Sequence, residues 1–139
     1  MKKTGVWLAV FFTVFLMGPT GCAHAPTDPD PLWAAQEYLG QQMEREDGAV
    51  LAYEFESAQV LEEETERIRQ RYKDSDIAGE RGWSQGFIDH MTAVETRYTV
   101  DYDNTKVPYS EGKMIHVLYL SREDENSPWE VFDSLTPYE

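Results

Sequence analysis

The sequence contains a single cysteine, Cys22, among its 139 residues. One cysteine cannot form a disulfide within the chain, so packing of the core must hold the fold together. Basic residues are also scarce: 12 lysines and arginines stand against 26 aspartates and glutamates, which gives a net charge of −14. Nucleic acids and anionic lipid headgroups repel a chain of this charge. The composition therefore argues against DNA or RNA binding and allows either a positively charged partner or simply a solubilising surface.

The motifs that identify common catalytic and metal centres are missing as well. The sequence has no Ser-His-Asp pattern, HExxH motif, phosphate-binding glycine loop or pair of cysteines. Asp101, Asp103 and Thr105, with Glu111 further on, loosely resemble a calcium loop. An EF-hand, however, needs a glycine and an acidic residue at the positions where this chain has Lys106 and Gly112. We therefore predict no metal ion and no cofactor.

The most informative segment is the first 22 residues. Lys2 and Lys3 precede an almost unbroken apolar run over residues 6–17 (VWLAVFFTVFLM), and residues 18–21 (GPTG) break any helix just before Cys22. Basic, apolar and small-residue regions in this order are typical of a secretory signal peptide. A cysteine directly after them resembles the bacterial lipoprotein signal, in which the thiol receives a diacylglycerol before cleavage. The resemblance implies a signal peptide over residues 1–21 and a protein anchored through lipidated Cys22 on the extracytoplasmic face of a bacterial cell membrane.

Three other interpretations of this segment stay open. An ordinary signal peptidase could cleave after residues 23–25 (AHA), although Pro26 would then follow the cleaved bond. Retention as a transmembrane helix would need roughly 20 apolar residues, more than the run provides. The cysteine could also be a free reactive thiol. Pro19 stands where lipoprotein signals usually carry leucine, whereas Thr20 and Gly21 fit the pattern.

A short tether over residues 22–30 leads into one predicted domain, residues 31–139, which opens with a helix. Asp30 and Pro31 are suited to the N-cap and the first helical position. Apolar residues then recur with helical spacing at Leu32, Ala35, Leu39 and Met43. A second helix is predicted over residues 62–73, because acids fill its first turns and bases its last.

The remaining pattern predicts strands and loops. Leu51, Tyr53 and Phe55 alternate with polar or small residues, as in a half-buried strand. Residues 74–82 are expected to be a loop, followed by a short turn or helix that begins at Ser84. The clearest alternation places one set of residues on a buried face: Val94, Thr96, Tyr98, Val100 and Tyr102.

Two further strands complete the expected sheet. Residues 113–122 are apolar on both faces, which predicts a central strand, and residues 129–135 form the last strand after a polar turn. Two helices followed mostly by antiparallel strands predict an α+β fold, with a sheet of about four strands packed on the N-terminal helices.

The C-terminal half resembles an uncharacterised family of Gram-positive lipoproteins. The resemblance rests on GW at 82–83, RYTVDYDNTKVPYSEG at 97–112, VLYLSRED at 117–124 and SPWEVFDS at 127–134. That family is thought to carry a nuclear-transport-factor-2-like, or cystatin-like, domain. The resemblance implies a strongly curved sheet wrapped around an N-terminal helix, with a cone-shaped cavity. It implies no activity, and a fold alone does not define one.

If this cavity is open, aromatic and polar side chains of the predicted sheet would line it. We name four candidate ligand-cavity residues: Tyr98, Tyr102, His116 and Trp129. Such a lining favours an apolar or flat ligand. Trp83, in a predicted loop, is the candidate for an exposed surface contact.

Three hypotheses about function follow. The first is a lipid-anchored cell-envelope protein whose non-catalytic domain binds a protein, a peptide or a small apolar ligand. The second is a small enzyme in which His116 acts with Asp101 or Asp103 as a general acid/base pair. The third is a structural component of an envelope assembly. The absence of a clustered catalytic set favours the first hypothesis.

Overall fold

The computed structural model describes residues 30–45 and 48–136 of the chain. Within these ranges the protein has the predicted α+β fold, with helices towards the N-terminal side of an antiparallel sheet. The elements are, in chain order, α2 (Pro31–Glu44), β1 (Val50–Val60), α3 (Glu62–Lys73), α4 (Asp76–Arg81), α5 (Gln85–Asp89), β2 (Thr92–Tyr102), β3 (Gly112–Ser121) and β4 (Glu130–Leu135).

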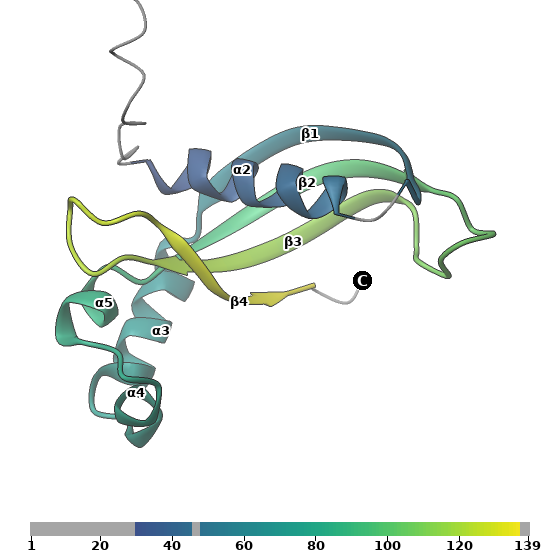
Figure 1. The fold of residues 1–139 in the computed structure, drawn as a ribbon. Helices are drawn as coiled ribbons and strands as arrows, with labels where there is room; N and C mark the ends of the chain where they lie inside the picture. The colour runs from purple at the N-terminus through teal and green to yellow at the C-terminus, as the bar shows by residue number, and fades with distance from the viewer. Residues whose placement is uncertain (1–29, 46–47, 137–139) are drawn as a thin grey trace, which may run out of the picture.

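The four strands lie in the order β1-β2-β3-β4, and each pairs antiparallel with the next. The sheet bends around helix α2, which crosses its inner face, while α3, α4 and α5 lie together beyond one end of the sheet (Figure 1). β3 lies between two strands, as its apolar sequence predicts. β1 and β4 are the edge strands.

The alternation in β2 separates two faces of the sheet, as predicted. Val94, Thr96, Tyr98 and Val100 are buried on the inner face, which α2 covers. Arg97 and Asp101 are exposed on the outer face. The strand register continues both faces into β3, because Thr96 pairs with His116.

Helix α2 supplies the apolar stripe that packs on the inner face. Asp30 caps the helix, since its side chain accepts a hydrogen bond of 2.9 Å from the amide of Leu32. Ala35 and Leu39 are fully or almost fully buried against the sheet. Half-buried Leu32 and Met43 extend the same stripe in both directions. The predicted helical face is therefore confirmed.

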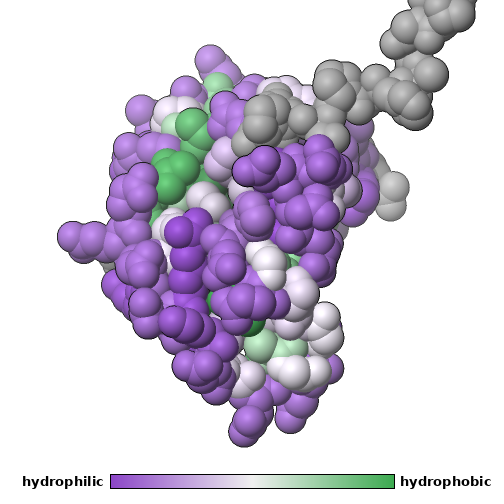
Figure 2. Space-filling view, turned by 90° about the vertical axis from the view of Figure 1, so that its left-hand side faces the viewer, coloured by the Kyte–Doolittle hydropathy of each residue, from purple (hydrophilic) through white to green (hydrophobic). Residues whose placement is uncertain are grey.

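A second core lies on the other side of the sheet, where the three later helices meet. Its buried members are Ile68, Ala78, Phe87, Ile88 and Met91. Half-buried aromatic residues from α3, β3 and β4 surround them. The face of the molecule on the α5 side is largely hydrophilic, and hydrophobic residues gather there in a small patch (Figure 2). The fold thus buries apolar side chains on both faces of one sheet, which compensates for the absence of a disulfide.

The predicted loop over residues 74–82 is wrong, because most of it forms helix α4. The side chain of Ser75 caps this helix by accepting hydrogen bonds from the amides of Ile77 and Ala78, at 3.1 and 3.4 Å. Gly82 ends the helix in the left-handed conformation at φ 71°, where glycine is favoured. Burial of Ala78 in the second core stabilises a helix in this polar segment.

The prediction for Leu51 is also wrong. The register between β1 and β2 shifts between Val50 and Ala52, so a bulge interrupts the alternation. Val50 packs against the inner core, while the side chain of Leu51 is 61 % exposed. Tyr53 and Phe55 lie on the inner side as predicted.

The signal peptide, Cys22 and all but the last residue of the tether lie outside the described residues. Residues 30–45 and 48–136 contain no helix that is long and apolar enough to cross a membrane.

Candidate functional site

The structure places all four predicted cavity residues on the inner side of the sheet. Tyr98 is buried, whereas Tyr102, His116 and Trp129 are half-buried around the core under α2. Tyr98 and His116 lie on neighbouring strands with their ring centroids 6.4 Å apart. The Tyr98 hydroxyl lies 3.4 Å from Nδ1 of His116, so these two residues form a polar contact. Trp129 packs against the same core, at the far end of the sheet from Tyr102.

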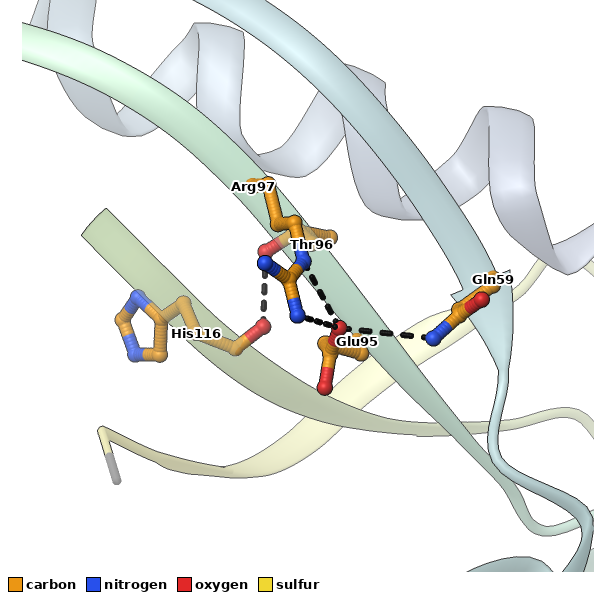
Figure 3. A network of polar contacts seen from close by, with 5 residues as sticks. All are labelled: Gln59, Glu95, Thr96, Arg97 and His116. Atoms are coloured by element: carbon orange, nitrogen blue, oxygen red, sulfur yellow. Dashed lines mark hydrogen bonds and ion pairs between the residues drawn. The ribbon is translucent and has the colours of Figure 1, made fainter. Parts of the chain in front are cut away.

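His116 is held through both its ring and its backbone. The hydroxyl of Thr96 donates a hydrogen bond of 2.7 Å to the carbonyl oxygen of His116, which reinforces the pairing of β2 with β3 (Figure 3). Burial lowers the pKa of the His116 imidazole, because a desolvated ring disfavours the charged form. Burial likewise raises the pKa of Tyr98 to about 12. Both groups are therefore neutral near pH 7.

The structure does not bring His116 together with the acids proposed as its catalytic partners. His116 pairs with Thr96 on β2. Asp101 lies five residues beyond Thr96 on that strand, which is roughly 17 Å at the rise of a β-strand. Its side chain is exposed on the outer face, whereas His116 is on the inner face. Asp103 follows the end of β2 and accepts hydrogen bonds from the amide and hydroxyl of Thr105. These bonds lower the pKa of the Asp103 carboxyl. The polar neighbour of the imidazole is instead Tyr98.

The outer face above His116 carries an exposed polar network. Glu95 accepts hydrogen bonds from Gln59 on β1, at 3.4 Å, and from Arg97 on its own strand, at 2.9 Å (Figure 3). A second nitrogen of Arg97 lies 2.9 Å from the same carboxylate oxygen. Exposed pairs of this kind contribute little to stability, and they leave the surface over β1 and β2 hydrophilic.

Trp129 is covered by a charged side chain. The guanidinium of Arg122 stacks over its ring at 4.5 Å from the centroid, and Arg122 is only 8 % exposed. Nη1 of Arg122 donates to the carbonyl of Glu125 at 3.3 Å. Among the described residues, neither Nε of Arg122 nor the indole nitrogen of Trp129 has a hydrogen-bond partner. Trp129 is thus a packed wall of the core rather than an open platform.

Trp83, proposed as an exposed contact, is half-buried in an aromatic cluster. Its ring stacks on Phe87 at 5.4 Å and meets the edges of Tyr72 and Phe132 at 5.3 and 5.2 Å. The guanidinium of Arg81 lies over it at 4.9 Å. Trp83 therefore joins α3, α5 and β4, and only part of its ring is available to a partner.

Next to this cluster lies a pocket that the sequence did not reveal. It has a volume of about 220 Å³ and lies between α3 and β4. Ile68, Tyr72, Phe132 and Leu135 provide its apolar surface, while Glu64, Arg71 and Asp133 are among its charged lining residues. An apolar pocket with a few convergent polar groups is the usual form of a binding site. We call it the α3–β4 pocket.

Tyr119 and Glu64 fix the polar side of the α3–β4 pocket. The Tyr119 hydroxyl donates a hydrogen bond of 3.0 Å to Oε1 of Glu64, and Glu64 also forms an ion pair with Arg67 one turn along α3. Burial, and next the bond to Glu64, raise the pKa of Tyr119 to about 12. The arrangement can hold a neutral or polar group by hydrogen bonding. No group of three or more metal-ligating side chains occurs in the part of the chain that the structure describes.

Sequence periodicity could not have found this pocket. α3 contributes only a thin apolar stripe, and β4 reaches the pocket through a shift in register between Tyr119 and Leu120. Phe132 lies on the outer face, opposite the inner-facing Val131, and joins Tyr119 there. The sequence offers two aromatic residues for this pocket, Tyr72 and Phe132, but it does not show that they meet.

Comparison with known proteins gives no match, since no protein-family model, curated protein or solved structure is significantly similar to this chain. The arrangement of the described residues therefore carries the functional argument.

Proposed function

We propose that this protein is a lipid-anchored cell-envelope protein whose domain binds a ligand without catalysis. The observation that carries the binding role is the α3–β4 pocket, an apolar recess with hydrogen-bonding groups at its side. Its volume of about 220 Å³ is below the roughly 300–1,000 Å³ of small-molecule sites, and it suits one side chain of a protein or peptide or a small apolar ligand. The position of Cys22 after an apolar segment supports the anchor.

The binding hypothesis has more support than the enzyme hypothesis. His116 contacts Tyr98, and Asp101 points to the opposite face of the sheet. A general acid/base pair needs two groups within hydrogen-bonding reach of each other or of a shared substrate atom. A His116–Asp101 or His116–Asp103 pair would require a large rearrangement of β2.

We also propose that the domain belongs to the cystatin-like, nuclear-transport-factor-2-like class and to the Gram-positive lipoprotein family that its C-terminal half resembles. Four antiparallel strands in sequence order, curved around a preceding helix, support this assignment (Figure 1). Three of the four sequence segments quoted for the resemblance fall largely on β2, β3 and β4, while GW at 82–83 lies between α4 and α5. An experimental structure that lacked an inner-face helix would contradict it.

The test of the binding site exchanges one exposed leucine at the pocket. Leu135 lines the α3–β4 pocket and is 50 % exposed, so Leu135→Glu should fold and yet make the pocket polar. Leu51 is 61 % exposed on β1, away from the pocket, and Leu51→Glu is the matched control. We expect Leu135→Glu to weaken binding of the dye 1-anilinonaphthalene-8-sulfonate about tenfold, measured by fluorescence titration, with little change for the control. Equal dye binding by both variants would exclude this pocket.

A further inference from the structure

A second recess lies on the other side of the sheet, between helix α2 and the edge strand β1. It has a volume of about 370 Å³. Glu37, Gly40 and Glu44 from α2 line it, together with two glutamines of that helix, and Tyr53 and Phe55 line it from β1. We call it the α2–β1 groove. It shares no lining residue with the α3–β4 pocket.

The charge of the α2–β1 groove is entirely negative. Glu37 and Glu44 supply two carboxylates, and none of the lining residues is a lysine or an arginine. The two glutamates are seven residues apart, or roughly 10 Å along the helix axis. Two exposed acids on β1, Glu54 and Glu56, add to the negative charge of this edge of the sheet. A groove lined by one sign of charge concentrates ligands of the opposite sign.

Gly40 leaves the α2 side of the groove without a side chain. Glycine in the middle of a helix is less favourable than alanine, because it loses more conformational freedom on folding. A Cβ atom built on Gly40 meets nothing within 4 Å, so packing within the described structure gives no reason for glycine. Its lack of a side chain leaves a flat stretch of helix between Glu37 and Glu44, over which an extended chain can pass closely.

The aromatic floor completes a site for a long cationic side chain. Tyr53 and Phe55 offer apolar surface on which the methylene stem of lysine or arginine can pack, and their rings attract a cation. The Tyr53 hydroxyl is buried and has no hydrogen-bond partner among the described residues. Aromatic rings below and carboxylates beside them are complementary to a basic residue, both in shape and in charge.

We propose that the α2–β1 groove binds a basic, extended segment of a partner polypeptide, with its backbone across Gly40 and its basic side chains on Glu37 and Glu44. The site is independent of the α3–β4 pocket and of the lipid anchor. The partner is thus a protein with exposed lysines or arginines, in agreement with the net charge of −14.

The experiment measures binding of a labelled five-lysine peptide to the full-length protein in detergent, by fluorescence anisotropy at low salt. The double variant Glu37→Gln/Glu44→Gln removes both carboxylates from the groove. Glu62→Gln/Glu63→Gln removes the same charge from exposed positions on α3 and is the control. We expect about tenfold weaker binding for the groove variant and less than about twofold for the control.

Gly40→Leu tests the groove without changing its charge. Leucine favours the helix, so the melting temperature should not fall, while its side chain fills the passage and abolishes peptide binding. Three outcomes would overturn the proposal: no binding of the peptide to the wild-type protein, equal weakening by both glutamate pairs, or full binding by Gly40→Leu. A free polyamine is tested with spermidine. If spermidine competes at a concentration similar to that of the peptide, the ligand is a polyamine and the assignment to a polypeptide is wrong.

Discussion

At the scale of single residues, the surroundings of His116 determine its chemistry. The ring contacts a tyrosine hydroxyl, and burial lowers the pKa of the imidazole below its ordinary value of 6.5. The unfolded chain therefore takes up a proton at a higher pH than the folded protein does. Neutral His116 contributes its full stability above pH 6.5, and this contribution is lost as the pH falls through the folded-state pKa.

This linkage predicts a pH-dependent stability that a single substitution reduces. We expect the urea midpoint of unfolding to fall between about pH 7.5 and about pH 5.5, because protonation of His116 favours the unfolded state. His116→Gln cannot be protonated in this range, so its midpoint should fall less. Equal decreases for the two proteins would mean that His116 does not couple folding to pH.

The facing of β2 and β3 is testable with two β-branched residues. Val100 is 1 % exposed on the inner face, and Val100→Asp should cost at least about 3 kcal/mol of unfolding free energy because it buries a charge without a partner. Ile115 is 36 % exposed on the outer face, opposite Arg97, and Ile115→Asp should cost less than about 1 kcal/mol. Thermal melts that reversed this order would show that the inner and outer faces are exchanged.

At the scale of elements, α4 shows how capping and packing make a helix from a polar segment. Ser75 satisfies two of the amides that an α-helix leaves unbonded at its start, and Gly82 ends the helix within two turns. Ala78 then contacts the second core. The helix carries Trp83 into its aromatic cluster, which forms the wall behind the α3–β4 pocket.

Loss of this cap should be measurable. Ser75→Ala should reduce the unfolding free energy by about 1 kcal/mol, since the amides of Ile77 and Ala78 lose their acceptor. Ser110 is exposed in the segment between β2 and β3, and Ser110→Ala should change stability by less than about 0.5 kcal/mol. Equal urea midpoints for Ser75→Ala and the wild type would show that packing alone holds α4.

At the scale of the whole molecule, one sheet carries two separate cores. α2 covers the inner face, and the three later helices cover one end of the outer face. The α2–β1 groove and the α3–β4 pocket therefore open on different sides of the sheet. A domain built in this way can bind two partners at the same time if both proposals hold.

Anchoring through Cys22 makes a prediction about the whole protein. The wild-type protein should partition into the detergent phase, because the two or three acyl chains of a mature lipoprotein give stable attachment. Cys22→Ser should remain an uncleaved precursor or be released in soluble form. Adding Ser110→Cys to this variant restores a thiol elsewhere and should not restore partitioning. Normal processing and partitioning of Cys22→Ser would contradict lipidation.

The sequence by itself determined the α+β class, the start of helix α2 at residue 31 and the facing of β2. These features follow from local periodicity. The burial of Ala35, Leu39 and Val100 confirms the predicted buried faces of the helix and the strand. Over residues 94–102 strict alternation places the apolar side chains on one face, so the local sequence was sufficient to predict which face is buried under α2.

Only the tertiary structure decided where the register shifts and which side chains meet. The bulge in β1 exposes Leu51, and the shift between β3 and β4 places Asp133 opposite Tyr119. Both depend on pairing with a neighbouring strand, which periodicity within one strand does not encode. Both pockets likewise arise from contacts between segments far apart in the chain, which one sequence does not specify.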